Sequence, residues 1–211
     1  MNEATRGTGE RLNQLLVEAG MPALGTDALR QFEAYISLFI RWNSRMNLTS
    51  LQDEDSILRR HLVESIACAH ALPTGIATLL DFGSGGGLPG IPIAICRPEI
   101  SVTLAESQGK KAAFLREAVR TAGLAAQVHA GRAEELQTVF DCVVLRAVDR
   151  MERAVAAAGC LVAPDGWLAL MTTGADRPRL VATAGEGFRW RGSIPLPGSD
   201  ARQLALGKRA G

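Results

Sequence analysis

A glycine-rich turn at residues 80–90 limits this chain to a small number of folds. The turn reads Leu80-Asp81-Phe82-Gly83-Ser84-Gly85-Gly86-Gly87-Leu88-Pro89-Gly90. The apolar residues 76–80 lead into it and are typical of a buried parallel strand. Residues 91–96 follow it as an apolar segment, and Pro89 and Pro92 lie where the first turn of a helix tolerates proline. This order of strand, glycine turn and helix indicates a doubly wound nucleotide-binding α/β fold.

The glycines fit two spacing patterns. One is Gly83-x-Gly85-x-Gly87, and the other is the dinucleotide-type Gly85-x-Gly87-x-x-Gly90. Both would let backbone N–H groups approach a ligand at the N-terminus of a helix, where a negative group is favoured. Tight packing of a turn would explain the same glycines, so the turn alone does not decide the function.

An acidic residue at the end of the next strand favours nucleoside binding. Residues 101–106 form a second apolar strand that ends at Glu106, 19 residues after Gly87. A carboxylate at this position can accept hydrogen bonds from both hydroxyls of a ribose. Residues 110–122 then have the apolar spacing of a helix, so the βα pattern continues.

The rest of the chain continues the alternation of strands and helices. Residues 127–130 and 140–145 read as a third and a fourth strand, 151–160 as a helix and 167–171 as a fifth strand. Two more strands are expected near 189–191 and 203–206. Glu134 follows the third strand, where it can face an adenine amino group or merely begin a helix. Arg146 follows the fourth strand, at the sheet edge where open α/β sheets bind ligands.

Residues 10–72 read as a helical extension that precedes the sheet. Thr26 and Asp27 are expected to cap a helix that includes residues 29–40, and a third helix is expected to begin near Asp53. The polar segment 42–50 between these helices reads as a turn. Arg59, Arg60 and His61 cluster on the third helix; spacing alone favours a solvated face on which Arg60 pairs with Glu64.

Composition excludes several classes of protein. The chain has 211 residues, 47% of them hydrophobic, and a net charge of +1, so any RNA site must be a local basic patch. No apolar run approaches the length of a membrane span, and the N-terminal residues lack a signal-peptide core. The cysteines lack CxxC spacing, so we expect four buried free thiols, no metal site and a cytoplasmic protein.

The chain resembles the RsmG (GidB) family of bacterial S-adenosylmethionine-dependent methyltransferases, which modify guanine N7 in 16S ribosomal RNA. The matching stretches are Asn47 to Ser50, Arg60 to Ser65, Asp81 to Pro92, Glu106-Ser107, Gly109 to Lys111, Arg132 to Glu135, Phe140-Asp141 and Arg146-Ala147. Their order and spacing hold from about residue 9 to 208. The Gly-Leu-Pro-Gly-Ile-Pro loop and the Arg-His helix are together specific, whereas the glycines alone are not.

This resemblance implies a fold, a cofactor and a partner. The expected fold is the Rossmann-like class I methyltransferase sheet in one domain, residues 1–211, with a helical extension at 1–72 and a cofactor-binding core at 73–211. The cofactor would be S-adenosylmethionine, and the partner 16S ribosomal RNA or the small ribosomal subunit, bound by a monomer. The expected cofactor-binding residues are Asp81, Gly83, Gly85, Leu88, Glu106, Ser107, Gln108, Ala133, Glu134 and Arg146; Arg60, His61, Lys110 and Lys111 are expected to bind RNA.

Three positions depart from the family pattern. Glu64 stands where the family usually has Asp, and the sequence Met171-Thr172-Thr173-Gly174 lacks the lysine that usually follows the fifth strand. Arg202 is followed by Gln203 instead of the usual His. Glu64 is a shift of one methylene, whereas the missing lysine and histidine remove possible RNA contacts, so the departures affect the expected substrate affinity more than cofactor binding.

The residues that are absent agree with transfer to a ring nitrogen. Guanine N7 has an in-plane lone pair and no proton, so methylation requires positioning and no general base. The chain has neither an Asn-Pro-Pro-Tyr motif nor a Pro-Cys nucleophile after the fourth strand, and no catalytic residue is assigned. The alternatives are a nicotinamide oxidoreductase, a non-catalytic nucleoside- or RNA-binding module, and a methyltransferase acting on a small molecule or another substrate.

Overall fold

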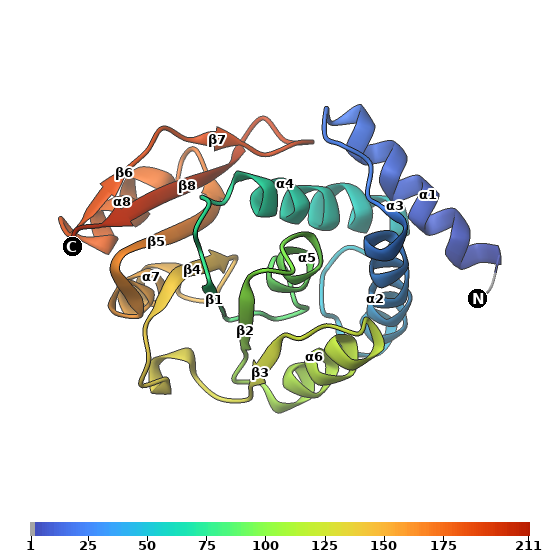
Figure 1. Cartoon of the computed structure of the whole chain (residues 1–211), viewed down its shortest axis with the longest axis horizontal. Helices are drawn as coiled ribbons and strands as arrows, with labels where there is room; N and C mark the ends of the chain where they lie inside the picture. The colour runs from blue at the N-terminus through green and yellow to red at the C-terminus, as the bar shows by residue number, and fades with distance from the viewer. Residues whose placement is uncertain (1–2) are drawn as a thin grey trace.

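The computed structural model describes residues 3–211, and its N-terminal part is a layer of helices (Figure 1). These are α1 (Glu3–Glu18), α2 (Thr26–Met46), α3 (Glu54–Ile57), the π-helix η1 (Leu58–Val63) and α4 (Glu64–Ala71). Their buried apolar residues, which include Leu16, Phe32 and Ile66, join the core that covers one face of the sheet. The expected helical extension is therefore present and packs on the α/β core.

The sheet has the order β3-β2-β1-β4-β5-β8-β6, with β7 paired to β8. Its strands are β1 (Thr78–Phe82), β2 (Ser101–Ala105), β3 (Gln127–His129), β4 (Phe140–Arg146), β5 (Val162–Thr173), β6 (Phe188–Trp190), β7 (Ile194–Pro195) and β8 (Arg202–Arg209). Strands β1 to β5 are parallel, whereas β8 runs antiparallel to β5, β6 and β7. The strand order reverses between β1 and β4, and ligands bind at this point in doubly wound sheets.

Helices cover both faces of the sheet. They are α5 (Gly90–Cys96), α6 (Gly109–Thr121), the short 3-10 helix η2 (Ala133–Glu135), α7 (Met151–Cys160) and α8 (Arg177–Ala184). Neighbouring residues of a strand point to opposite faces, so Leu79 and Val144 pack with α2, α4, α5 and α6, while Leu80 and Val143 pack with α7 and α8. Figure 1 shows α1, α2 and α6 at one end of the molecule and β6, β8 and α8 at the other.

Several predictions from the sequence need correction. Helix α2 continues to Met46 instead of ending before Trp42. The buried amide of Asn43 supports this last turn, because it donates to Leu51 O and accepts from Thr49 N. Its N-cap is Gly25, so Thr26 is already helical. The predicted start at Asp53 is confirmed, since its carboxylate accepts from Ser56 N. Helix α8, strand β7 and the π-helix lay outside the expectations.

The cysteine prediction holds only in part. All four thiols are free, but Cys160 is exposed and Cys96 is half-buried, whereas Cys68 and Cys142 are buried. Cys160 ends α7 on its outer side, where an apolar sequence context does not ensure burial. Within residues 3–211, no helix has the length and apolar character needed to cross a membrane.

Candidate active site

The glycine turn between β1 and α5 is hydrogen-bonded to a buried carboxylate at the end of β1. Oδ2 of Asp81, which is 1% exposed, accepts hydrogen bonds from Ser84 Oγ at 2.6 Å and Gly90 N at 3.0 Å. A side chain at Gly90 would collide with Asp81. Burial raises the pKa of Asp81 to about 6, although these two hydrogen bonds oppose the shift. Asp81 therefore fixes the shape of the turn.

A second carboxylate holds the turn from the neighbouring strand. Glu106 directly follows β2 and is 6% exposed. Its Oε2 accepts from Gly85 N at 2.9 Å and its Oε1 from Gln108 N at 2.7 Å. Gly85 has a φ of 57°, a left-handed conformation that glycine adopts without strain. Each oxygen of Glu106 retains a further lone pair, so this carboxylate can still accept from a ligand hydroxyl.

Helix α2, which belongs to the helical extension, contacts the same turn. The hydroxyl of buried Tyr35 donates to Gly86 O at 2.6 Å. A Cβ at Gly86 would lie 2.7 Å from the ring of Phe39, so only glycine lets α2 approach this closely. Burial raises the pKa of Tyr35 well above its ordinary value, which keeps the phenol protonated as a donor. The helical extension thus helps to shape the ligand-binding turn.

The turn lines a cavity of about 500 Å³, which we call the glycine-loop cavity. Its lining includes the predicted residues Gly83, Gly85, Leu88, Glu106, Ser107, Gln108, Arg146, His61 and Lys111. A neighbouring cavity of about 280 Å³ is lined by Ala133 and Glu134. Gly83, Ser107 and the segment 148–149 line both cavities, so the two hollows lie side by side over the ends of β1, β2 and β4. Its extent suits an elongated nucleoside ligand.

Arg146, at the end of β4, is bound by the segment that runs through the π-helix. Its Nη2 donates to Arg60 O at 2.7 Å and lies 2.9 Å from His61 Nδ1. Its Nη1 contacts His61 O at 3.3 Å and Ser65 Oγ at 3.2 Å. A π-helix is wider than an α-helix and is frequent at functional sites, and here it coincides with the carbonyl groups that receive the guanidinium. Through these hydrogen bonds, Arg146 connects the helical extension to the sheet.

Glu64 places a negative charge between two arginines. It is 1% exposed; its Oε2 accepts from Arg146 Nη2 at 3.0 Å, and its Oε1 lies 2.9 Å from Arg202 Nη2 on β8. The second contact is an ion pair without the geometry of a directed hydrogen bond. Burial raises the pKa of Glu64, and the two arginines counteract that rise. The expected pairing of Glu64 with Arg60 is replaced by these longer-range partners.

His61 is a neutral ring with both nitrogens engaged. Its Nδ1 faces the Arg146 donor at 2.9 Å, so it acts as the acceptor, and its Nε2 lies 2.7 Å from Thr49 Oγ1. This pattern assigns the ring proton to Nε2. Burial, and then the charge of Arg146, lower the pKa of His61 to about 4. Thr49 connects this ring to the glycine-loop cavity, which it also lines.

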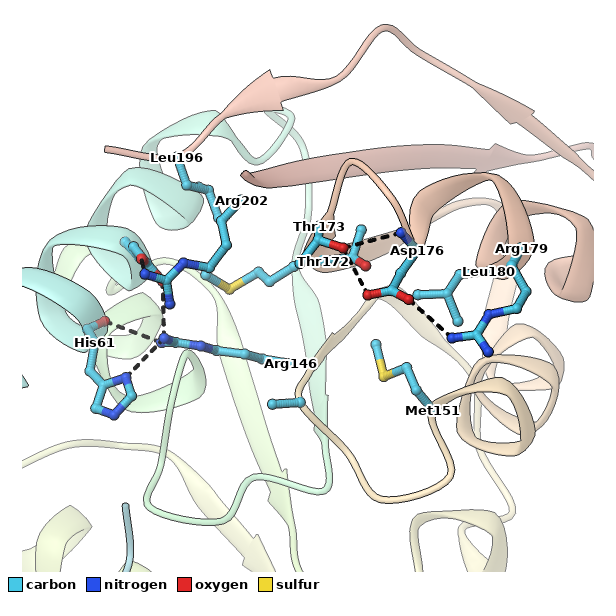
Figure 2. A pocket seen from close by; sticks show the side chains of 13 residues that line it. His61, Arg146, Met151, Thr172, Thr173, Asp176, Arg179, Leu180, Leu196 and Arg202 are labelled. Atoms are coloured by element: carbon cyan, nitrogen blue, oxygen red, sulfur yellow. Dashed lines mark hydrogen bonds and ion pairs between the residues drawn. The ribbon is translucent and has the colours of Figure 1, made fainter. Parts of the chain in front are cut away.

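A further cavity of about 370 Å³ lies beyond Arg146, and we call it the arginine cavity (Figure 2). It is lined by His61, Glu64, Arg146, Ala147, Met151, Met171, Thr172, Thr173, Asp176, Arg179, Leu180, Leu196 and Arg202. His61, Arg146 and Ala147 also line the glycine-loop cavity, so the two hollows adjoin at these residues. One site can therefore hold a nucleoside ligand and a second, separate molecule.

Comparisons with known proteins identify the family. The family described as rRNA small subunit methyltransferase G matches residues 28–182. The chain belongs to this family. The ribosomal RNA small subunit methyltransferase G of Xanthomonas euvesicatoria is 43% identical over 162 residues, which cover 74% of either chain. That of Xanthomonas oryzae is 40% identical over 182 residues, 83% of this chain and 84% of the relative.

Solved structures of methyltransferases share the fold. The mitomycin 7-O-methyltransferase MmcR is 19% identical, with a TM-score of 0.63, and the match covers 96% of this chain and 67% of that one. The S-adenosylmethionine-dependent methyltransferase SibL gives a TM-score of 0.63 at 16% identity, covering 98% and 75%. The predicted class I methyltransferase fold is confirmed, and family membership makes the chain an rRNA methyltransferase that uses S-adenosylmethionine.

The residues of this methyltransferase fit that cofactor. Glu106 has acceptor capacity at the end of β2, and Glu134 lies in the adjoining cavity where an adenine would extend. Asp81 is not among the described residues that line either cavity, so any effect it has on the ligand passes through the turn. Direct contact of each predicted residue with S-adenosylmethionine stays a prediction.

The predicted RNA-binding residues divide between two surfaces. His61 and Lys111 line the glycine-loop cavity, and Lys110 is exposed beside Lys111 at the start of α6. The side chain of Arg60 lines a separate groove between α1, η1 and the segment after β7. Its carbonyl group, which accepts from Arg146, faces the site.

Sequence reasoning missed Thr49, Thr173, Asp176 and Arg202 as site residues. Thr49 stands in a stretch that matched the family, and Arg202 stands where the family has the arginine of its late Arg-His pair, so their positions offered a signal. Asp176 and Thr173 offered none, because they come from the segment where this chain departs from the family pattern.

Proposed function

We propose that this methyltransferase transfers a methyl group from S-adenosylmethionine to N7 of a guanine in 16S ribosomal RNA. The observation that supports this most directly is the junction of the glycine-loop cavity with the arginine cavity at Arg146 and Ala147. Such a junction brings two ligands edge to edge, as a direct transfer between them requires.

The chain's own residues would hold the cofactor on one side of that junction. Glu106 would accept from the ribose hydroxyls, and the backbone N–H groups of the glycine turn would face the polar groups of the ligand. Ala133 and Glu134 would contact the adenine. When bound, S-adenosylmethionine supplies a sulfonium methyl group that a lone pair can attack.

The protonation state of the site favours a ring nitrogen as acceptor. Guanine N7 has a free lone pair, so its methylation needs no proton to be removed before transfer. Both nitrogens of His61 are engaged, and its pKa of about 4 makes it a weak base. We therefore expect the single-turnover rate to be nearly flat from about pH 6.5 to about 9, whereas an exocyclic amine acceptor would require a base.

The proposed partner is the 16S RNA of the small ribosomal subunit, bound by a monomer in the cytoplasm. Lys110 and Lys111 stand at the rim of the glycine-loop cavity, where phosphate groups of an incoming RNA would pass.

The decisive experiment maps N7-methylguanine in 16S ribosomal RNA. RNA from cells lacking this protein should lack one such nucleotide, and the purified chain with S-adenosylmethionine should restore it in extracted small subunits or in RNA. Methylation restored at an exocyclic nitrogen or a ribose hydroxyl would contradict the assignment of N7. An unchanged modification pattern would contradict the proposed substrate.

A further inference from the structure

The far wall of the arginine cavity holds an acidic group that the family resemblance does not explain. Asp176 precedes α8 as its N-cap residue, yet within the described chain it makes no capping bond to that helix. Its Oδ2 instead accepts from Thr173 Oγ1 at 2.7 Å, and its Oδ1 from Arg179 Nη2 at 3.1 Å. The carboxylate therefore accepts from side chains instead of the backbone N–H groups of the helix end, and it lines the cavity.

Thr173 keeps the carboxylate in this orientation. Its hydroxyl donates to Asp176 Oδ2, and the backbone N–H of Asp176 donates back to Thr173 Oγ1 at 3.1 Å. Thr172 and Thr173 occupy the segment where the family usually has lysine. The departure therefore places a threonine hydroxyl, which donates to the half-buried Asp176, where the family usually has a flexible cation.

The two walls of the cavity differ in the polar groups that they present. Figure 2 shows His61, Arg146 and Arg202 on one side and Thr173, Asp176 and Arg179 on the other. The remaining lining is largely apolar and includes Met151, Met171, Leu180 and Leu196, which suit the flat faces of an aromatic base. Its volume of about 370 Å³ falls within the range of sites for small molecules.

We infer that the arginine cavity receives the acceptor guanine and that Asp176 recognises its Watson–Crick edge; this rests on the proposed function. With N7 at the junction near Arg146 and Ala147, the N1–H and N2 amino groups lie on the far side of the base, toward Asp176. An ionised carboxylate is purely an acceptor, and each oxygen of Asp176 has one described partner, which leaves lone pairs for both donors.

Arg202 would recognise the opposite edge of the guanine base. Guanine O6 lies beside N7, and Arg202 retains donors beyond its ion pair with Glu64. Adenine would present an amino group toward Arg202 and an acceptor nitrogen toward Asp176, both with the wrong polarity. A site built on such hydrogen bonds rejects the wrong base strongly, because its polar groups would be left unpaired.

The test compares two RNA fragments in single-turnover assays. One has the target guanosine, and the other has inosine, which keeps N7, O6 and N1–H but lacks the N2 amino group. We expect the wild-type enzyme to methylate guanosine roughly 10- to 100-fold faster than inosine. Asp176→Ala should slow guanosine transfer to the wild-type inosine rate or below it, because the N1–H contact is lost as well, and it should methylate the two fragments equally, because the group that distinguishes them is gone.

Glu152→Ala provides the matched control. Glu152 Oε1 pairs with Arg179 Nη1 at 2.9 Å, so this change removes a carboxylate from the same arginine while leaving Asp176 in place. It should retain the wild-type preference for guanosine. Calorimetric binding of S-adenosylmethionine should be unchanged in both variants, which separates a loss of base recognition from a loss of folding.

Each contrary result has a distinct meaning. Equal wild-type rates on guanosine and inosine, or a full preference retained by Asp176→Ala, would overturn the role of Asp176 while leaving N7 transfer intact. Equal loss of preference in Glu152→Ala would overturn it too, since general disturbance of α7 and α8 would then be the cause. Failure of the wild type to methylate either fragment, or extracted small subunits, would overturn the proposed function and this inference together.

Discussion

The two sides of the active site are held together in different ways. On the glycine-loop side, the carboxylates of Asp81 and Glu106 accept from backbone N–H groups of Gly85, Gly90 and Gln108. On the arginine side, Arg146 and Arg202 converge on Glu64, and these residues come from β4, β8 and α4. The first arrangement is made largely within one βαβ segment, whereas the second joins distant parts of the chain.

This difference determines how each side should respond to change. Backbone donors persist when a neighbouring side chain is replaced, so the glycine turn can keep part of its shape. A buried ion-pair network loses its compensation when one member is removed, because the remaining charges stay out of water. We therefore expect stability to depend most on the arginine side and cofactor affinity to depend most on the glycine-loop side.

The largest effect is expected from Glu64→Ala. Removing this 1% exposed carboxylate would leave Arg146 and Arg202 close together without a counter-charge. We expect the free energy of unfolding to fall by about 3–5 kcal/mol, measured by urea denaturation. Glu64→Asp introduces the residue that the family usually has and keeps the charge, so it should lower the free energy of unfolding much less.

The matched control for that variant is Asp55→Ala. Asp55 also accepts from two arginines, Arg11 and Arg59, but it lies at the surface, where such pairs contribute little. Its replacement should change the unfolding midpoint only slightly. Comparable losses in the two variants would show that burial is not what makes the Glu64 network important.

The next largest effect concerns pH, and the two sides should respond with opposite sign. His61 has a folded-state pKa lowered to about 4, so its stabilising contribution is complete above its ordinary value of 6.5 and is lost as pH falls toward 4. Asp81 has a pKa raised to about 6 from 3.8, so its contribution is complete below 3.8 and is lost as pH rises through 6. Each change amounts to at most about 3 kcal/mol.

These opposing contributions should partly cancel in the wild type between about pH 4 and 6. Urea denaturation of His61→Asn and Asp81→Asn across this interval would separate them. The stability advantage of the wild type over His61→Asn should grow as pH rises, and its advantage over Asp81→Asn should shrink. Differences that stay constant with pH would contradict both assignments.

A smaller effect is expected from Glu106→Ala on cofactor binding. If Glu106 holds the ribose, its loss should weaken S-adenosylmethionine binding by about 1–3 kcal/mol, roughly 5- to 150-fold, because charge-assisted hydrogen bonds are lost. Isothermal calorimetry on the folded variant measures this directly. Glu135 is an exposed acid next to Glu134, so Glu135→Ala serves as the control and should bind S-adenosylmethionine normally. Unchanged affinity in Glu106→Ala would contradict the prediction that Glu106 binds the ribose.

The same contrast explains what could be predicted from the sequence. The glycine turn, the place of Glu106 after β2 and the alternation of strands and helices from β1 to β5 follow from local spacing, and the structure confirms them. The pairing of Glu64 with Arg146 and Arg202 joins residues that are 82 or more positions apart, so helical spacing suggested Arg60 instead. The π-helix could not be predicted from residue spacing, because the contact that accompanies it is a tertiary hydrogen bond from Arg146, far away in the sequence.

The smallest and most specific effect concerns the RNA-facing rim beside the glycine turn. Lys110 and Lys111 begin α6, and Lys111 lines the glycine-loop cavity. Replacing both with Ala should weaken RNA binding and reduce its salt slope by about one to two units, because fewer counterions are released from phosphates. Cofactor affinity should stay unchanged.

Arg59→Ala is the comparison variant for the lysine pair. Arg59 is engaged by Asp55 and Glu18 and lines the groove on the far side of η1, so its loss should leave the salt slope close to that of the wild type. Filter-binding titrations of a 16S RNA fragment over a range of salt concentrations would measure both variants. A wild-type slope in the double-lysine variant together with a reduced slope in Arg59→Ala would move the RNA face from the glycine-loop side to the extension.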